Sequence, residues 1–318
     1  MESTIESTSS TEPSASSLEF DVVKEYEIAL QKETSAVATK IALAKLVSQS
    51  KETTLQGLRR ELKEASDRLA NEIRDIPIKS VCDLFMIELA REMKTGEDFE
   101  TTKARLVEKG KQNEKITEIA RHKIALEAER FFFEGLRVTT LSYSRVVLQC
   151  LVEASKKWKI HVDVLQGGPD EPGKKMVNDL MEQKIECRYV PDCCVSSVVA
   201  ATDIVLVGAA AVTENGGIIN KMGTRTLACV AKEHNKDFFV AVESYKFTKL
   251  YPLSQHHLET LVPIRGIGVE PEGLPKGART YSPELEYTPP SYIRNLWTDI
   301  GIKTPSNISE DLFLLFNL

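Results

Sequence analysis

The chain has 318 residues, of which 42% are hydrophobic and 28% charged, and its formal net charge is -6. This composition is typical of a globular protein with about two domains. The acidic balance argues against nucleic-acid binding, which needs an excess of Lys and Arg to neutralise phosphates. No apolar run approaches the roughly 20 residues that span a bilayer. Since residues 1–4 also lack an apolar signal core, we expect a cytosolic protein with no membrane or direct nucleic-acid contact.

The first part of the chain predicts a tail followed by a helical domain. Residues 1–18 are rich in Ser and Thr, and so few apolar groups predict a disordered tail. Residues 19–134 then show apolar residues at helical spacing, with few Gly or Pro interruptions. The last helix of this region is expected to be long, from about Phe99 to Phe133. We therefore predict an N-terminal helical bundle domain.

Residues 135–318 carry a different pattern, in which short β-rich apolar runs alternate with helical segments. Such alternation predicts βαβ units and a Rossmann-like α/β domain with a parallel sheet. The expected strands are Val138–Leu141, Ile160–Leu165, Ile185–Val190, Ile204–Val207 and Phe238–Val242, with helices at Arg145–Trp158 and Gly173–Lys184. Ligands bind beyond the carboxyl ends of parallel strands. This rule indicates three loops as a binding site: Ser142–Arg145, Gln166–Gly173 and Gly208–Gly217.

The first loop contains groups that can hold a phosphate. Tyr143, Ser144 and Arg145 stand at the expected start of a helix, where backbone N–H groups and a guanidinium attract anions. The alternative is an ordinary helix cap formed by Ser144, with Arg145 on the surface.

The third loop is rich in turn-forming residues. Asn215 lies in a turn, and Asn220 and Lys221 then approach a helix that runs through Cys229. Glycines, a lysine and a helix start together can bind an anion, although the same residues also suit a purely structural turn. We retain all three as candidate phosphate-binding residues.

Cofactor and metal motifs are missing from the sequence. No G-x-G-x-x-G or Walker-type loop follows an expected strand, and the six cysteines form no Cys-x-x-Cys pair. The adjacent Cys193 and Cys194 do not have the spacing of a zinc finger. We expect neither a metal nor a cofactor, and we expect the cysteines to be buried, reduced thiols.

Several segments together carry a family resemblance that extends over roughly residues 20–318. These segments include Thr54–Leu58, Arg121–Ala125, Tyr143–Val147, Glu214–Lys221, Val242–Phe247, Tyr287–Pro290 and Thr298–Gly301. Through them the chain resembles the regulatory alpha subunits of translation initiation factor 2B, within the methylthioribose-phosphate isomerase and ribose-bisphosphate isomerase superfamily.

The resemblance implies that catalysis has been lost. The isomerases use a Cys in the first loop and an Asp after the glycine of the third loop, and the matching positions here are Ser142 and Ala210. An Arg of the second loop is replaced by Gly168. We therefore expect no catalytic residues and at most a vestigial phosphate site. The alternatives are a sugar-phosphate isomerase-like enzyme and a metabolite sensor that binds a sugar phosphate without chemistry.

The resemblance also implies a regulatory role in a complex. Such subunits form homodimers and join the beta, gamma, delta and epsilon subunits of a complex that exchanges guanine nucleotide on initiation factor 2. Their helical domain helps to sense initiation factor 2 phosphorylated on its alpha subunit, and Thr54, Gln56 and Leu58 are the contacts we expect. Thr54 also suits a helix start without any partner. The apolar run Leu312–Leu318 is expected at a subunit contact or over the chain's own core.

Overall fold

The computed structural model describes residues 20–317, apart from 32, 74–75, 94–97, 112, 263–265, 267–273, 276 and 279. The expected tail, residues 1–18, lies outside the described residues.

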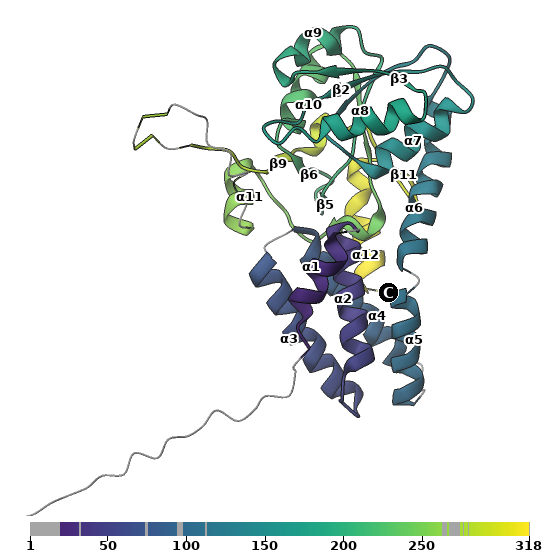
Figure 1. The fold of residues 1–318 in the computed structure, drawn as a ribbon, viewed down its shortest axis with the longest axis vertical. Helices are drawn as coiled ribbons and strands as arrows, with labels where there is room; N and C mark the ends of the chain where they lie inside the picture. Colours follow the sequence, from purple (N-terminus) through teal and green to yellow (C-terminus); the bar gives the residue numbers. More distant parts are fainter. Residues whose placement is uncertain are drawn as a thin grey trace, which may run out of the picture.

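Five helices form the N-terminal part of the molecule, drawn in purple to blue in the lower half of Figure 1. Their bounds are Val22–Leu30 (α1), Ser35–Gln49 (α2), Leu55–Ile73 (α3), Ile76–Met93 (α4) and Phe99–Lys111 (α5). The apolar residues at helical spacing lie on one side of a helix, as predicted: Leu58, Leu62 and Leu69 form one fully buried face of α3. The predicted helical region is confirmed.

The main sheet has seven strands within the described residues, in the order β11-β10-β7-β4-β1-β2-β3. All neighbours are parallel except β11, which runs antiparallel at one edge. The bounds are Arg137–Leu141 (β1), His161–Leu165 (β2), Glu186–Val190 (β3), Ile204–Val207 (β4), Asp237–Ala241 (β7), Asn295–Thr298 (β10) and Gly301–Lys303 (β11). The fold class expected from the sequence, α/β with a Rossmann-like parallel sheet after a helical bundle, is confirmed.

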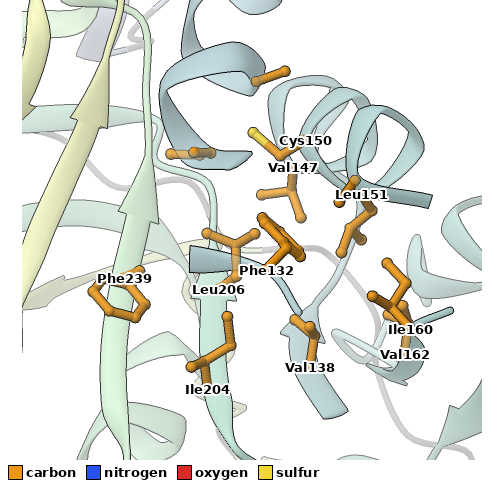
Figure 2. Packing of buried hydrophobic residues seen from close by; sticks show 14 of the residues in the cluster. Phe132, Val138, Val147, Cys150, Leu151, Ile160, Val162, Ile204, Leu206 and Phe239 are labelled. Atoms are coloured by element: carbon orange, nitrogen blue, oxygen red, sulfur yellow. The ribbon is translucent and has the colours of Figure 1, made fainter. Parts of the chain in front are cut away.

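Helices cover both faces of this sheet, because successive side chains of each strand point to opposite sides. Along β4, Ile204 and Leu206 face one core, while Val205 and Val207 face the other. The first core contains side chains from Arg145–Ser155 (α7) and Gly173–Glu182 (α8); the second is covered by Val195–Ala200 (α9), Thr224–Glu233 (α10) and Ile308–Asn317 (α12). Figure 2 shows the first core, where α7 places Val147, Cys150 and Leu151 over the strand residues.

One further helix joins the two parts of the molecule. Where the sequence predicted a single helix over Phe99–Phe133, the structure has α5 and then Asn113–Ala128 (α6). Ile124, Ala125 and Ala128 of α6 belong to the core beneath the sheet. Figure 1 shows α6 beside α7 and continuing toward α5. The last predicted helix of the bundle therefore packs on the sheet.

A second, smaller sheet was not predicted. It has the order β8-β5-β6-β9, with bounds Ala211–Thr213 (β5), Ile218–Lys221 (β6), Phe247–Thr248 (β8) and Leu285–Thr288 (β9), and the helix Gln255–Leu261 (α11) packs beside β9. The expectation of a loop throughout Gly208–Gly217 is therefore wrong after Ala210, where a hairpin begins. Short 3-10 turns lie at Glu129–Phe131 (η1), Asp192–Cys194 (η2), Ser244–Lys246 (η3), Pro290–Tyr292 (η4) and Pro305–Asn307 (η5).

The C-terminal apolar run forms α12, and its two faces differ. Leu312 and Phe316 are buried against the second core of the sheet. Phe313 and Leu314 point outward, with exposed fractions of 64% and 46%. The run therefore covers the chain's own core with one face and leaves an apolar face exposed.

Candidate functional site

The loop after β1 has a constrained backbone at the carboxyl edge of the sheet. Ser142 is buried and adopts a left-handed conformation with φ of 64°. Its N–H donates to the carbonyl of Leu165 at the end of β2, over 3.0 Å. Ser144 is the N-cap of α7, because its hydroxyl accepts from the N–H of Val147 at 3.5 Å. The loop is therefore fixed between β2 and the start of α7.

The second loop lies directly against the first. Gly167 has φ of 69°, and a Cβ added to it would lie 2.9 Å from the Cβ of Ser142. Only glycine combines this conformation with so close an approach. The carboxylate of Asp192 accepts from the N–H groups of Gly167 and Gly168, at 3.0 and 2.7 Å. A half-buried acceptor from the turn after β3 thus holds the second loop in place.

The third loop completes this group of contacts. A Cβ added to Gly208 would lie 2.9 Å from the Cβ of Ser144 and would overlap its hydroxyl. The three loops that follow β1, β2 and β4 therefore meet at one edge of the sheet, as the parallel topology predicts. Ser142 and Ala210 lie in two of these loops, and Ala210 donates its N–H to Ile219, which starts the hairpin.

The predicted cations of this site are already paired with acids. Lys221 lies on strand β6 and not at a helix start, and its ammonium bonds the carboxylate of Asp170 in the second loop. Arg145 forms an ion pair of 3.7 Å with Glu33, which precedes α2. An incoming phosphate would therefore compete with two carboxylates for its cations.

Tyr143 is directed toward α8. Its ring lies under the ammonium of Lys175, 4.5 Å from the ring centroid. Burial raises the pKa of Tyr143, and Asp179 raises it further. Tyr143 is thus held between two residues of α8 and does not titrate near neutral pH.

Asn215 and Asn220 have structural partners. Asn215 lies in the hairpin turn, at the opposite end of β5 from Ala210, where it donates to the Pro252 carbonyl at 2.9 Å and to the Tyr287 hydroxyl at 2.8 Å. Asn220 donates to Thr224 at the start of α10. The structure therefore brings Lys221 to the meeting loops but leaves Asn215 at the far end of the hairpin.

A buried network of charged side chains lies next to these loops and was not predicted from the sequence. Glu243 follows β7 and is only 1% exposed. Its Oε1 lies 3.1 Å from Arg121 Nε on α6, and its Oε2 lies 2.9 Å from Lys246 Nζ. Lys246 also donates to the carbonyl of Ala209 in the third loop, at 3.1 Å. The network therefore links α6 to the loops at the sheet edge.

The electrostatics of this network fix the charge of Glu243. Burial alone would raise its pKa, but Lys246 and Arg121 outweigh this effect and hold the pKa at about 2. Burial, with the negative charge of Glu243, raises the pKa of Tyr245. Glu243 is thus permanently ionised and paired near neutral pH, which makes it a poor proton donor or acceptor. A Glu and a Lys three residues apart, directly after a buried strand, were the signal in the sequence.

The three residues at the start of α3 that were expected to contact a partner differ in how exposed their side chains are. Thr54 and Gln56 are exposed, and the Thr54 hydroxyl accepts from the N–H of Gly57 at 3.1 Å as a helix cap. Leu58 is fully buried in the helical core. The expectation that Leu58 touches a partner is therefore wrong, because its side chain packs inside the bundle.

The described residues contain no group of three or more His, Cys, Asp or Glu side chains that would hold a metal. Within the same part of the chain, no helix has both the length and the apolar character needed to cross a bilayer. The cysteines differ from the expectation of uniform burial: Cys82 and Cys150 are buried, whereas Cys193, Cys194 and Cys229 are exposed.

The helical bundle, the parallel sheet and the three loops at its carboxyl edge define an α/β protein of Rossmann-like architecture. The model of the Initiation factor 2 subunit family matches residues 31–305. This match extends over most of the chain, and the chain belongs to that family.

Similar sequences include proteins of two kinds. "Translation initiation factor eIF2B subunit alpha" of Dictyostelium discoideum is 36% identical over 94% of this chain and 98% of its own length. The subunit of the same name from Caenorhabditis elegans is 30% identical, with coverages of 89% and 93%. "Ribose 1,5-bisphosphate isomerase" of Archaeoglobus fulgidus is 30% identical, but over 66% of this chain and 67% of its own.

Solved structures share the fold. The Pyrococcus horikoshii translation initiation factor eIF-2B has a TM-score of 0.71 at 20% identity, over 89% of this chain and 97% of that one. A chain of the tetrameric eIF2B-beta2-delta2 complex of C. thermophilum has a TM-score of 0.76 at 18% identity, with coverages of 92% and 94%.

Proposed function

We propose that this chain is a non-catalytic regulatory subunit of the exchange factor that acts on translation initiation factor 2. The observation that carries the proposal is the 36% identity to an alpha subunit over nearly the whole length of both proteins. The proposed partners are a second copy of the chain and the beta, gamma, delta and epsilon subunits, in the cytosol. The proposed N-terminal tail is 1–18, the helical domain 19–134 and the α/β domain 135–318.

The absence of catalysis is part of the proposal. Ser142 and Ala210 occupy the positions at which we infer that the isomerases carry Cys and Asp, and neither side chain is an effective base. The nearby carboxylate of Glu243 is held ionised between Arg121 and Lys246. The proposal retains a vestigial phosphate site formed by Tyr143, Ser144, Arg145, Asn220 and Lys221. Asn215 falls outside this site, since it lies at the far end of the hairpin.

The finer part of the proposal is that the helical bundle senses the phosphorylated alpha subunit of initiation factor 2. Exposed Thr54 and Gln56 lie at the N-terminus of α3, a helix of 19 residues whose partial positive charge favours anions. Exposed Lys51, Arg59 and Lys63 lie close by in sequence, on and before the first turns of α3. A phosphorylated, anionic partner suits this surface.

Copurification tests the assignment to the complex. The tagged full-length chain, expressed in its own cells and purified at low salt, is expected to recover the other four subunits. Recovery of the chain alone would contradict the proposal.

Variants at the start of α3 test the sensing surface. Gln56→Ala and Thr54→Val are expected to weaken binding of phosphorylated initiation factor 2 to the assembled complex. Thr54→Ser keeps the capping hydroxyl and serves as the matched control for helix stability. Unchanged discrimination between phosphorylated and unphosphorylated factor in Gln56→Ala and Thr54→Val would exclude this surface and leave the subunit assignment intact.

The alternative function is a sugar-phosphate isomerase-like enzyme or a sugar-phosphate sensor, and the relation to an isomerase favours it. Calorimetry with ribose 1,5-bisphosphate distinguishes these cases. Heat that disappears in Lys221→Ala would indicate a sensor, and turnover that disappears in Ser142→Ala would indicate an enzyme. No heat and no turnover are expected from a regulatory subunit whose site cations are paired with acids.

A further inference from the structure

Two adjacent thiols are exposed in the turn η2, directly after edge strand β3. Cys193 and Cys194 are both exposed, and their Sγ atoms lie 4.0 Å apart. The family assignment gives these residues no role. Their geometry decides what kind of group they suit.

The distance between the two sulfurs fits a shared ligand better than a bond between them. A disulfide requires about 2.05 Å between the sulfurs. Two thiolates bound to one tetrahedral centre at about 2.3 Å lie about 3.8 Å apart. The observed 4.0 Å is close to the second value. A pyramidal centre with a narrower angle between its two sulfurs draws them somewhat closer, which rotation of the two exposed side chains allows.

The number of protein ligands at the two thiols limits which centre they can bind. Thiolates select soft, thiophilic centres. No third His, Cys, Asp or Glu completes a metal site with the pair among the residues that the structure describes. The described residues therefore offer no closed zinc site with four protein ligands that includes this pair. A trivalent arsenic centre that already carries one carbon substituent needs only two sulfur ligands.

We propose that Cys193 and Cys194 form a dithiol site that captures monosubstituted trivalent arsenicals. In the reaction, an arsenoxide R–As=O gains two As–S bonds, one to each Sγ. The two thiol protons leave with the arsenoxide oxygen as one water molecule, and arsenic remains trivalent. No oxidant or reductant is needed.

The turn holds the two thiols side by side before any ligand binds. The Asp192 carboxylate accepts from the Gly167 and Gly168 N–H groups, and the N–H of Cys194 donates to the Pro191 carbonyl at 2.9 Å. After one sulfur has bound, the second reaction is intramolecular, which raises its effective concentration and strengthens binding by roughly 10²–10⁴ over a single thiol. Cys229 on α10 is exposed without an adjacent cysteine and provides a natural control.

The test uses the full-length chain and phenylarsine oxide, in the presence of excess glutathione as a competing single thiol. Intact-mass spectrometry is expected to show a gain of one arsenoxide less one water, and thiol titration is expected to show the loss of two reactive thiols. Cys193→Ser and Cys194→Ser are each expected to lower the affinity at least about 100-fold. Cys229→Ser is expected to bind as the unmodified chain does.

The opposite pattern would overturn the proposal. Wild-type affinity in Cys193→Ser or Cys194→Ser would show that the pair does not chelate, and loss of capture in Cys229→Ser would place the reactive thiol on α10. Circular dichroism checks the folding of each variant, since exposed Cys-to-Ser changes normally alter stability little. The outcome is independent of the proposed function, because it requires neither the other subunits nor initiation factor 2.

Discussion

Arg121 of α6 and Glu243 after β7 are separated by 122 residues in sequence, yet their side chains form a buried ion pair of 3.1 Å. Lys246 contacts the second oxygen of the same carboxylate at 2.9 Å. Side-chain exposures of 16% for Arg121 and 2% for Glu243 limit screening by water. This pair links the helix that joins both parts of the molecule to the edge of the sheet.

The first prediction concerns the stability that depends on this pair. Glu243→Gln leaves two cations without their counter-charge in a poorly hydrated position, so we expect the free energy of unfolding to fall by about 3 kcal/mol. Urea denaturation followed by circular dichroism measures the change. Glu118→Gln, on the exposed surface of α6, is the matched control and should cost less than about 0.5 kcal/mol. Equal losses in the two variants would show that the ion pair does not stabilise the fold.

The second prediction concerns acid stability. The pKa of Glu243 is lowered in the folded protein from 4.5 to about 2, so the folded state favours the ionised form. Its stabilising contribution is complete above pH 4.5 and declines as the pH falls toward 2. The difference in urea midpoint between the wild-type chain and Glu243→Gln should therefore shrink over this interval. A constant difference from neutral pH to pH 2 would contradict the assigned titration.

The third prediction concerns the meeting of the loops. Gly208→Ala places a methyl group against Ser144, the N-cap of α7, so we expect a loss of about 1–3 kcal/mol in unfolding free energy. Gly266→Ala is the control, because its added methyl would meet only an ordinary contact of 3.7 Å with the Ser282 carbonyl. Thermal denaturation of both variants measures the effect. Similar midpoints for the two would mean that the loops separate easily.

The fourth prediction separates the two faces of α12. Leu312→Ala removes a buried side chain and should cost about 2–5 kcal/mol. Phe313→Asp changes a side chain that is 64% exposed, so the stability of the monomer should change by less than about 0.5 kcal/mol. If the exposed face contacts a second copy, light scattering will show the monomer mass for Phe313→Asp and the dimer mass for wild type. A dimer that persists in Phe313→Asp would place the contact elsewhere.

Local patterns predicted the larger elements because each pattern has a direct physical cause. The apolar run Ile204–Val207 is buried on both sides of the sheet, which gave the strand its continuous apolar sequence. The leucines of α3 face one core and therefore recur at helical spacing. Both the continuous apolar run and the helical spacing can be seen in the sequence alone.

The second sheet escaped prediction because its strands are short and its pairing is distant. Strand β8 has two residues, and β6 pairs with β9, which lies more than 60 residues later. No alternation is visible over two or three residues. Lys221 was therefore expected in a segment that approaches a helix, whereas it ends strand β6 and pairs with Asp170.

The position of the site in the fold was predictable from the sequence, but the side chains that its charged residues pair with were not. The topology rule indicated the three loops, and the close approaches of Gly167 and Gly208 confirm that they meet. Single-sequence reasoning has no means of pairing Arg145 with Glu33 or Arg121 with Glu243, since these pairs depend on how the helices pack against the sheet. Leu58 was misassigned for a different reason, because its spacing with Leu62 and Leu69 already indicated the buried face of α3 and was not used.

Helix α6 has a consequence for how this chain can be divided. It places Ile124, Ala125 and Ala128 beneath the sheet and also contacts α2 and α5 of the bundle. A fragment that stops at Lys111 would leave the bundle without the helix that contacts α2 and α5, and a fragment that starts at Asn113 would keep α6 on the sheet but expose its side toward the bundle. The two parts are thus not independent modules, because α6 packs into the core of the sheet and at the same time contacts two helices of the bundle.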